Sequence, residues 1–76
     1  METLDRISID PNVCLGQPTV RGMRIPVSIL LKMLASGKSF ASIREAYPEI
    51  EDEDLRQAMF YAAWLASDEL RPARRA

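Results

Sequence analysis

Hydrophobic residues recur with two different spacings along this chain. Between Arg6 and Asp10 they alternate, with Ile7 and Ile9 on one side, which predicts a short strand with one buried face. A turn at Pro11 follows. Val20 to Ile25 is the next candidate strand, interrupted at Gly22. The pattern therefore predicts a small N-terminal β element.

The first helix is predicted over residues 26–36. Val27, Leu30, Leu31 and Leu34 recur at the spacing of one helix face. Pro26 fits the first turn of a helix, and a C′ glycine, here at position 37, commonly ends one.

Two further helices are predicted downstream. Ser39 is a suitable N-cap for a short helix that carries Phe40, Ile43 and Tyr47 on one face and ends before proline 48. A longer helix begins near Glu51 or Asp52 and extends to about residue 70. We expect a mainly α domain over residues 1–70, followed by a basic tail at 71–76.

The first and third predicted helices carry more apolar surface than a small core can bury. The segment "AMFYAAWLA", residues 58–66, is apolar nearly all round, which is typical of a helix buried nearly all round. A chain of 76 residues buries only about 60% of the surface that its unfolded form exposes. Alternatively, Tyr61 and Trp64 are scattered, half-exposed surface aromatics. We expect a dimer or partner interface formed by Ile29, Met33, Phe60, Tyr61, Trp64 and Leu65.

Composition leaves few other means of stabilising so small a domain. Cys14 is the only cysteine and the chain has no histidine, so neither an intrachain disulfide nor a zinc site is expected. The absence of histidine, and of an activating neighbour for any serine, argues against an enzyme. Four consecutive carboxylates at 51–54 cannot all converge on one metal ion, because successive helical residues point about 100° apart. No cofactor or metal is expected, and oligomerisation remains.

Charge is unevenly distributed although the net charge is only −1. Residues 1–38 have a net charge of +2, residues 39–70 of −6 and residues 71–76 of +3. The second and third helices have the dimensions of a helix-turn-helix, but also those of any two packed helices. A recognition helix that begins with four carboxylates would be repelled by DNA phosphates. The same carboxylates favourably complement the positive end of the helix dipole.

Two arginines, Arg21 and Arg24, flank a glycine in a segment rich in proline and glycine. They could form a preorganised pair of cations for phosphates or for a partner's carboxylates. They could equally pair with Asp10 or Asp5 and tie this loop to the first strand. Both interpretations remain open from the sequence.

The sequence indicates a cytoplasmic protein without a membrane partner. Its start lacks the basic and apolar regions of a signal peptide, and no apolar run approaches the roughly 20 residues of a membrane span. A lone cysteine suits a reducing compartment.

The loop and the start of the first helix resemble a known family. Residues 16–27 form the pattern G-x-P-x-x-R-G-x-R-I-P-V, which is similar to the signature of the bacterial family called domain of unknown function 433. The opening strand and turn, "RISIDPNVCLG", and the segment from "LASGKSF" to "AMFYAAW" also resemble that family. The resemblance covers roughly residues 6–66. One departure is Glu51, where the family usually has a capping threonine, so we expect Asp52 to take over the cap.

The resemblance implies a homeodomain-like helix-turn-helix fold, a homodimer and a VapB-type antitoxin. Such an antitoxin would bind and inhibit a PIN-like ribonuclease toxin and could repress its own operon by binding operator DNA. The candidate DNA contacts are Arg6, Arg21, Arg24 and Lys38. The candidate toxin contacts are the tail cations Arg71, Arg74 and Arg75, which would meet the acidic nuclease site. The alternative function is a protein–protein interaction adaptor without DNA binding.

Overall fold

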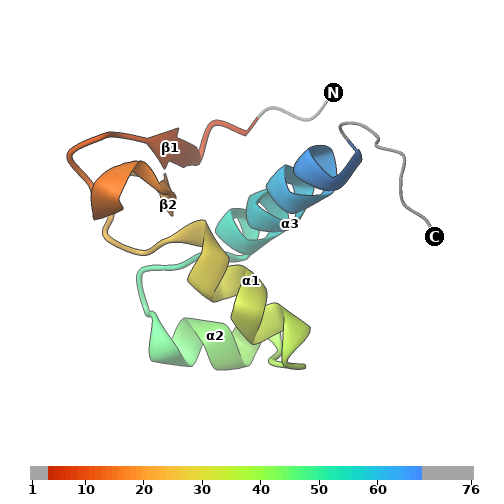
Figure 1. Cartoon of the computed structure of the whole chain (residues 1–76). Helices are drawn as coiled ribbons and strands as arrows, with labels where there is room; N and C mark the ends of the chain where they lie inside the picture. Colours follow the sequence, from red (N-terminus) through yellow and green to blue (C-terminus); the bar gives the residue numbers. More distant parts are fainter. Residues whose placement is uncertain (1–3, 68–76) are drawn as a thin grey trace.

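The structure, a computed structural model, describes residues 4–67 of the chain. The elements are β1 (Ile7–Ile9), the short turn η1 (Cys14–Gly16), β2 (Pro18–Val20), α1 (Val27–Ala35), α2 (Phe40–Ala46) and α3 (Asp52–Ser67). Three helices and a two-stranded antiparallel sheet confirm the predicted mainly α class with a short β element. Figure 1 shows the hairpin beside the start of α3, whose other end projects away from α1 and α2.

The hairpin corrects the predicted second strand. Strand β1 pairs with β2 in antiparallel register, with Ile7 opposite Val20. The chain then turns at Arg21 and Gly22, which have φ angles of 50° and 73°. The Met23 amide donates to the Val20 carbonyl at 2.8 Å. Two residues with positive φ closed by this bond are characteristic of a type I′ turn, so the predicted strand over 20–25 was wrong. The chain reverses at Gly22 and returns alongside β2 instead of extending.

The ends of α1 and α2 follow the sequence signals. Gly37 adopts a φ of 92°, its amide donates to Leu34 O, and the Lys38 amide donates to Met33 O, both at 3.0 Å. These two bonds form a Schellman motif, which confirms the predicted C′ glycine. The Ser39 hydroxyl accepts a hydrogen bond from the Ser42 amide at 3.1 Å, which confirms the predicted N-cap.

Helix α3 begins at Asp52 and is described as far as Ser67, so its predicted extension to residue 70 lies outside the described residues. The residue before the helix is Glu51, and its amide donates to Asp54 Oδ2 at 2.8 Å. A hydrogen bond from the N-cap amide to the side chain three residues further along the chain is one half of a capping box. The N-cap position therefore stays at Glu51 and does not shift to Asp52 as we expected, and Asp54, at N3, accepts the capping hydrogen bond from the Glu51 amide.

The core lies where α1 and α3 cross beside the hairpin. Its buried apolar side chains come from every helix, from β2 and from the loops, and are Val20, Ile25, Val27, Leu30, Ile43, Ile50, Leu55 and Ala58. On α3 the buried residues stop at Ala58, and Met59 and Phe60 are already exposed. Most of the second half of the longest helix therefore extends past the core, and Tyr61 is packed partly against it.

Candidate protein-interaction surface

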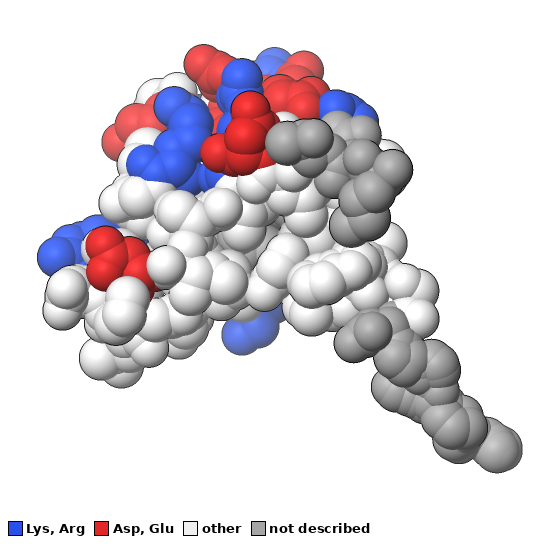
Figure 2. Space-filling model, turned by 90° about the horizontal axis from the view of Figure 1, so that it is seen from above, with Lys and Arg blue, Asp and Glu red and all other residues white. Residues whose placement is uncertain are grey.

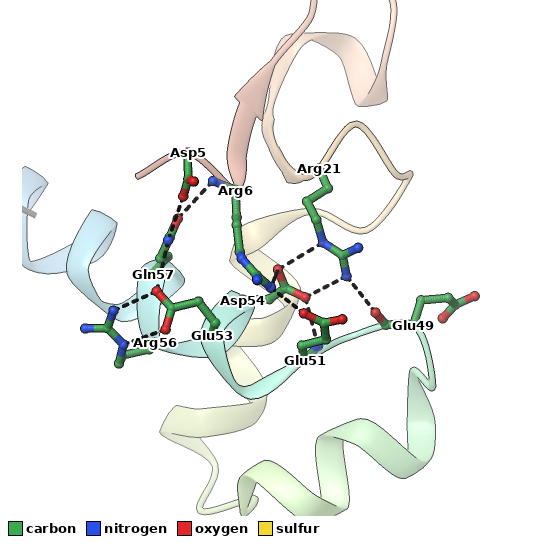
Figure 3. Close-up of polar contacts among 9 residues, drawn as sticks. All are labelled: Asp5, Arg6, Arg21, Glu49, Glu51, Glu53, Asp54, Arg56 and Gln57. Carbon is green, nitrogen blue, oxygen red and sulfur yellow. Dashed lines mark hydrogen bonds and ion pairs between the residues drawn. The ribbon is translucent and has the colours of Figure 1, made fainter. Parts of the chain in front are cut away.

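A buried carboxylate joins the hairpin to the first turn of α3. The Asp54 side chain is wholly buried and accepts a bidentate pair from Arg21, at 3.1 Å from Nε and 2.8 Å from Nη2. Arg6 Nη1 donates to the same carboxylate at 3.2 Å, and the Glu51 amide supplies a fourth bond. Figure 3 shows both guanidinium groups converging on Asp54 from the hairpin side. Four donors match the acceptor capacity of one carboxylate.

The turn at Arg21 places this side chain. Its left-handed backbone is unfavourable for a residue with a Cβ, and the ion pair with Asp54 provides a compensating contact. Arg21 Nη2 also donates to the Glu49 carbonyl at 2.7 Å, just before α3 begins. On the other side, the Arg6 amide donates to Gln57 Oε1 at 2.9 Å. The cluster therefore connects β1, the I′ turn and α3.

The protonation state of the cluster follows from these bonds. Burial by itself would raise the pKa of the Asp54 carboxyl, but hydrogen bonds from Arg21, the Glu51 amide and Arg6 outweigh it, so the pKa falls below 3.8. Hydrogen bonds to Glu51 and Asp54 raise the pKa of the Arg6 guanidinium, and the bond to Asp54 raises that of Arg21. Asp54, Arg6 and Arg21 are therefore all charged at neutral pH.

The four candidate DNA contacts do not form one basic patch. Arg6 and Arg21 are held by carboxylates of α3 and its N-terminal turn, and the partner of Arg21 is Asp54, not Asp10 or Asp5. Arg24 and Lys38 are exposed and lie at opposite ends of α1. In Figure 2, Lys and Arg side chains lie interleaved with Asp and Glu along one edge, and most of the rest of this face is uncharged.

The acidic start of α3 is divided among separate partners. Glu51 pairs with Arg6 at 2.6 Å, and Asp52 pairs with Arg44. Hydrogen bonds from Arg56 and then from Gln57 lower the pKa of Glu53 to about 2. Within residues 4–67 no group of three or more potential metal ligands converges. Sequence reasoning did not single out Asp54 from its acidic neighbours. The available signal was its position three residues after the N-cap, directly before the buried Leu55.

The predicted interface residues of α3 lie on its projecting half. From Met59 to Ser67 the helix contains no charged residue. Phe60 is 42% exposed, Trp64 48% and Leu65 51%, whereas Tyr61 is partly buried against the core. The rings of Tyr61 and Trp64 lie 6.1 Å apart. On α1, Ile29 is exposed and Met33 packs partly against the core. The candidate toxin contacts Arg71, Arg74 and Arg75 lie outside the described residues.

A groove separates the projecting half of α3 from α1. Its volume is about 560 Å³. It is lined by Gln17, Pro18, Val27, Ser28, Leu31, Tyr61, Ala62, Leu65 and Ala66, none of which is charged. A smaller hollow of about 230 Å³ lies against other residues of the same helix, namely Arg56, Met59, Phe60 and Ala63. Grooves with an apolar lining accept amphipathic helices. Among the described helices, none is long and apolar enough to cross a bilayer.

Comparison with known proteins gives three matches of similar extent. Residues 7–62 match the family described as "Protein of unknown function (DUF433)". The uncharacterized protein y4eO of Sinorhizobium fredii (strain NBRC 101917 / NGR234) is 36% identical over 56 residues, which are 74% of this chain and 25% of that protein. A crystal structure of a DUF433 member protein from Anabaena variabilis ATCC 29413 is similar with a TM-score of 0.72 and 36% identity, over 78% of this chain and 58% of that one. The chain thus spans a quarter of the length of this curated relative.

Proposed function

We propose that this chain, which belongs to the DUF433 family, is the antitoxin of a type II toxin–antitoxin pair. It would inhibit a PIN-like ribonuclease by binding it. The observation that carries the proposal is the charge-free half of α3, which presents Phe60, Trp64 and Leu65 to solvent. Contiguous exposed apolar surface on a small domain is typical of a site that binds another protein. A stoichiometric inhibitor needs such a surface and needs no catalytic group.

The distribution of charge favours a protein ligand over DNA. Affinity for DNA depends mainly on cations that neutralise phosphates. Two of the four candidate cations, Arg6 and Arg21, are already neutralised by Asp54 and Glu51. Operator binding therefore receives less support than toxin binding, and an adaptor without DNA binding is the alternative function. The homeodomain-like helix-turn-helix and the homodimer belong to the same proposal.

In the proposed mechanism, the apolar half of α3 supplies most of the affinity. Large aromatic and aliphatic side chains at the centre of an interface usually carry most of the binding energy. The cations Arg71, Arg74 and Arg75 follow α3 in the sequence and would pair with the carboxylates of an acidic, metal-dependent nuclease site. Occupying those carboxylates excludes the RNA phosphate, so inhibition would be competitive with substrate and stoichiometric.

A titration tests the proposal directly. A PIN-like nuclease encoded beside the gene for this chain is mixed with increasing amounts of the full chain, and cleavage of a fluorescent RNA is measured. We expect activity to fall in proportion to the added chain and to reach zero at a fixed molar ratio. Full cleavage at a tenfold molar excess of chain, or the absence of any neighbouring nuclease that binds it, would refute the antitoxin assignment.

Two variants of one helix make the titration specific for the surface. Trp64→Glu places a charge within the apolar segment, and Ser67→Glu places the same charge at an exposed polar position three residues further. We expect Trp64→Glu to weaken inhibition by about 100-fold, as for other hot-spot residues, and Ser67→Glu to have little effect. Equal potency of the two variants would argue against this surface.

DNA binding is tested separately by a gel shift on the upstream DNA over a salt series. Arg24→Ala/Lys38→Ala is the appropriate variant, because substitution of Arg21 would also disrupt its ion pair with Asp54. Specific binding that weakens with salt and is reduced in the double variant would support operator binding. No shift at low salt would favour the adaptor alternative.

A further inference from the structure

The turn η1, between the two strands, holds a leucine in a backbone conformation that leucine disfavours. Cys14, Leu15 and Gly16 all have left-handed backbones, with φ angles of 51°, 59° and 83°. Of the three, only the glycine avoids a steric penalty, because a Cβ in this region approaches the following carbonyl oxygen. Leu15 is also 95% exposed, so its side chain contributes almost nothing to the core. Glycine or asparagine would suit this position better in the isolated domain.

The loop around this leucine is fixed by its own hydrogen bonds. The Val13 amide donates to the Asp10 carbonyl at 2.9 Å, and the Gly16 amide donates to the Val13 carbonyl at 3.0 Å. The Gln17 amide then donates to the Cys14 carbonyl at 3.1 Å. Figure 1 shows this turn in orange at the edge of the molecule. Unfavourable backbone conformations that the surrounding structure holds in place are concentrated at functional sites, whereas an exposed leucine on an ordinary backbone needs no explanation.

The loop adjoins the apolar surface of the groove. Gln17 and Pro18 line the groove, and Leu15 is two residues before Gln17, so their Cα atoms are at most about 7 Å apart. Pro18 lies opposite Ile9 in the hairpin, and the side chains of directly opposite residues share one face of a sheet. Ile9 is itself 63% exposed. A protein that covers the groove and the exposed half of α3 is therefore within reach of this loop.

The charges near the loop favour a protein partner over a nucleic acid or a membrane. Asp10 is the only charged residue from position 7 to position 20. Nucleic acids are bound mainly through cations that neutralise phosphates. Segments that insert into anionic membranes usually carry lysine or arginine beside their apolar residues. An apolar side chain with one anion near it fits instead an apolar pocket of a protein, with a neutral or basic rim.

We propose that Leu15 is an anchor residue that inserts into an apolar pocket of the protein partner, in addition to the contact made by the exposed half of α3. This inference rests on the proposed antitoxin function, which supplies the partner, a PIN-like nuclease. Because hydrogen bonds fix the loop before binding, little conformational freedom is lost when the leucine is buried. The Leu15 side chain thereby lowers the stability of the free chain and raises its affinity for the partner.

Two substitutions test the anchor, because they separate stability from binding. Leu15→Asn and Leu15→Gly both suit the left-handed conformation, and both remove the apolar side chain. Each full-length variant is titrated against a PIN-like nuclease encoded beside the gene, and cleavage of a fluorescent RNA is measured. We expect inhibition to weaken by about 30-fold in both variants, while their urea midpoints equal or exceed that of the wild type.

Two further variants serve as controls for the same loop. Leu15→Met keeps an apolar side chain of similar volume, so inhibition should stay within a factor of about three of the wild type. Asn12→Ala shortens another exposed side chain of the loop and should leave inhibition unchanged. A loss in Asn12→Ala as large as that in Leu15→Asn would reveal a general effect of the loop and would overturn the anchor.

The outcomes separate the anchor from the proposed function. Inhibition at wild-type strength by Leu15→Asn and Leu15→Gly would overturn the anchor and leave the antitoxin assignment intact. No inhibition by the wild type would overturn both, because the anchor requires the nuclease as its partner. Cosedimentation with vesicles of phosphatidylcholine and phosphatidylserine tests the membrane, and we expect no binding. Vesicle binding by the wild type that is lost in Leu15→Asn would assign the loop to a membrane and overturn the protein pocket.

Discussion

The substitution Asp54→Asn should destabilise the fold more than any other change of one carboxylate to its amide in this domain. Asn keeps the size of the side chain but removes the charge and one acceptor oxygen. Two of the four hydrogen bonds to Asp54 are then lost, and the new amide donors face the donors of Arg21, Arg6 or the Glu51 amide. The hairpin would lose its main polar attachment to α3.

The size of the effect can be worked out from these contacts. Removing one partner of a buried ion pair costs about 3–5 kcal/mol. The side chains of Arg6 and Arg21 are 29% and 36% exposed, so water partly hydrates them after the substitution. We therefore expect the lower end of the range, about 3 kcal/mol. Domains of this size have a free energy of unfolding of roughly 4–11 kcal/mol, so the loss is a large fraction of the total.

Urea denaturation followed by far-ultraviolet circular dichroism measures this loss. With an m-value of about 1 kcal/mol per molar urea, the midpoint should fall by about 3 M. Asp52→Asn is the matched control. Asp52 lies in the same turn of α3 as Asp54 and is also paired with an arginine, Arg44 of α2, but its side chain is 65% exposed. We expect it to cost less than about 1 kcal/mol. A cost for Asp54→Asn no larger than that of Asp52→Asn would refute the role given to the buried cluster.

Three further predictions concern stability. Folding lowers the pKa of the Asp54 carboxyl below its ordinary value of 3.8, so the contribution of Asp54 to the free energy of unfolding is present above that pH and is lost as the pH falls through the folded pKa. Urea midpoints of the wild type should therefore fall more steeply below about pH 4 than those of Asp54→Asn. Parallel curves would contradict this. Leu15 has a φ of 59° and is 95% exposed. Asn tolerates this left-handed conformation better than Leu or Ala, so Leu15→Asn should raise the free energy of unfolding by about 1 kcal/mol and Leu15→Ala should not. A lowered urea midpoint for the Asn variant would count against the reasoning. Ser39→Ala removes the N-cap of α2 and should cost about 1 kcal/mol in the same assay, and an unchanged midpoint would show that the cap is dispensable.

The family signature acquires a structural explanation from these contacts. Gly16 and Gly22 both have positive φ, at 83° and 73°, and Pro26 precedes the first residue of α1. Arg21, between them, binds the buried Asp54. Four signature residues therefore build and anchor the loop. Arg24, which is exposed, remains available for other contacts.

The candidate surface was predictable in composition and not in shape. Helical periodicity identified an excess of apolar residues on the third helix, including Phe60, Trp64 and Leu65. The periodicity did not show where α1 and α3 diverge. That divergence places Leu65 in the groove between the two helices, whereas Phe60 lines a separate, smaller hollow. The divergence depends on how the two helices cross, and crossing is set by packing across the whole core.

The sequence by itself determined the mainly α class, the bounds of α1 and α2, their caps at Ser39 and Gly37, and the family. These features depend on interactions within a few residues, so local spacing is enough to specify them. Only the tertiary structure decided that Arg21 binds Asp54, 33 residues away, and that the chain reverses at Gly22. Many carboxylates were equally plausible partners along the chain, and only the packing of α3 against the hairpin brings one of them, buried, to the arginine.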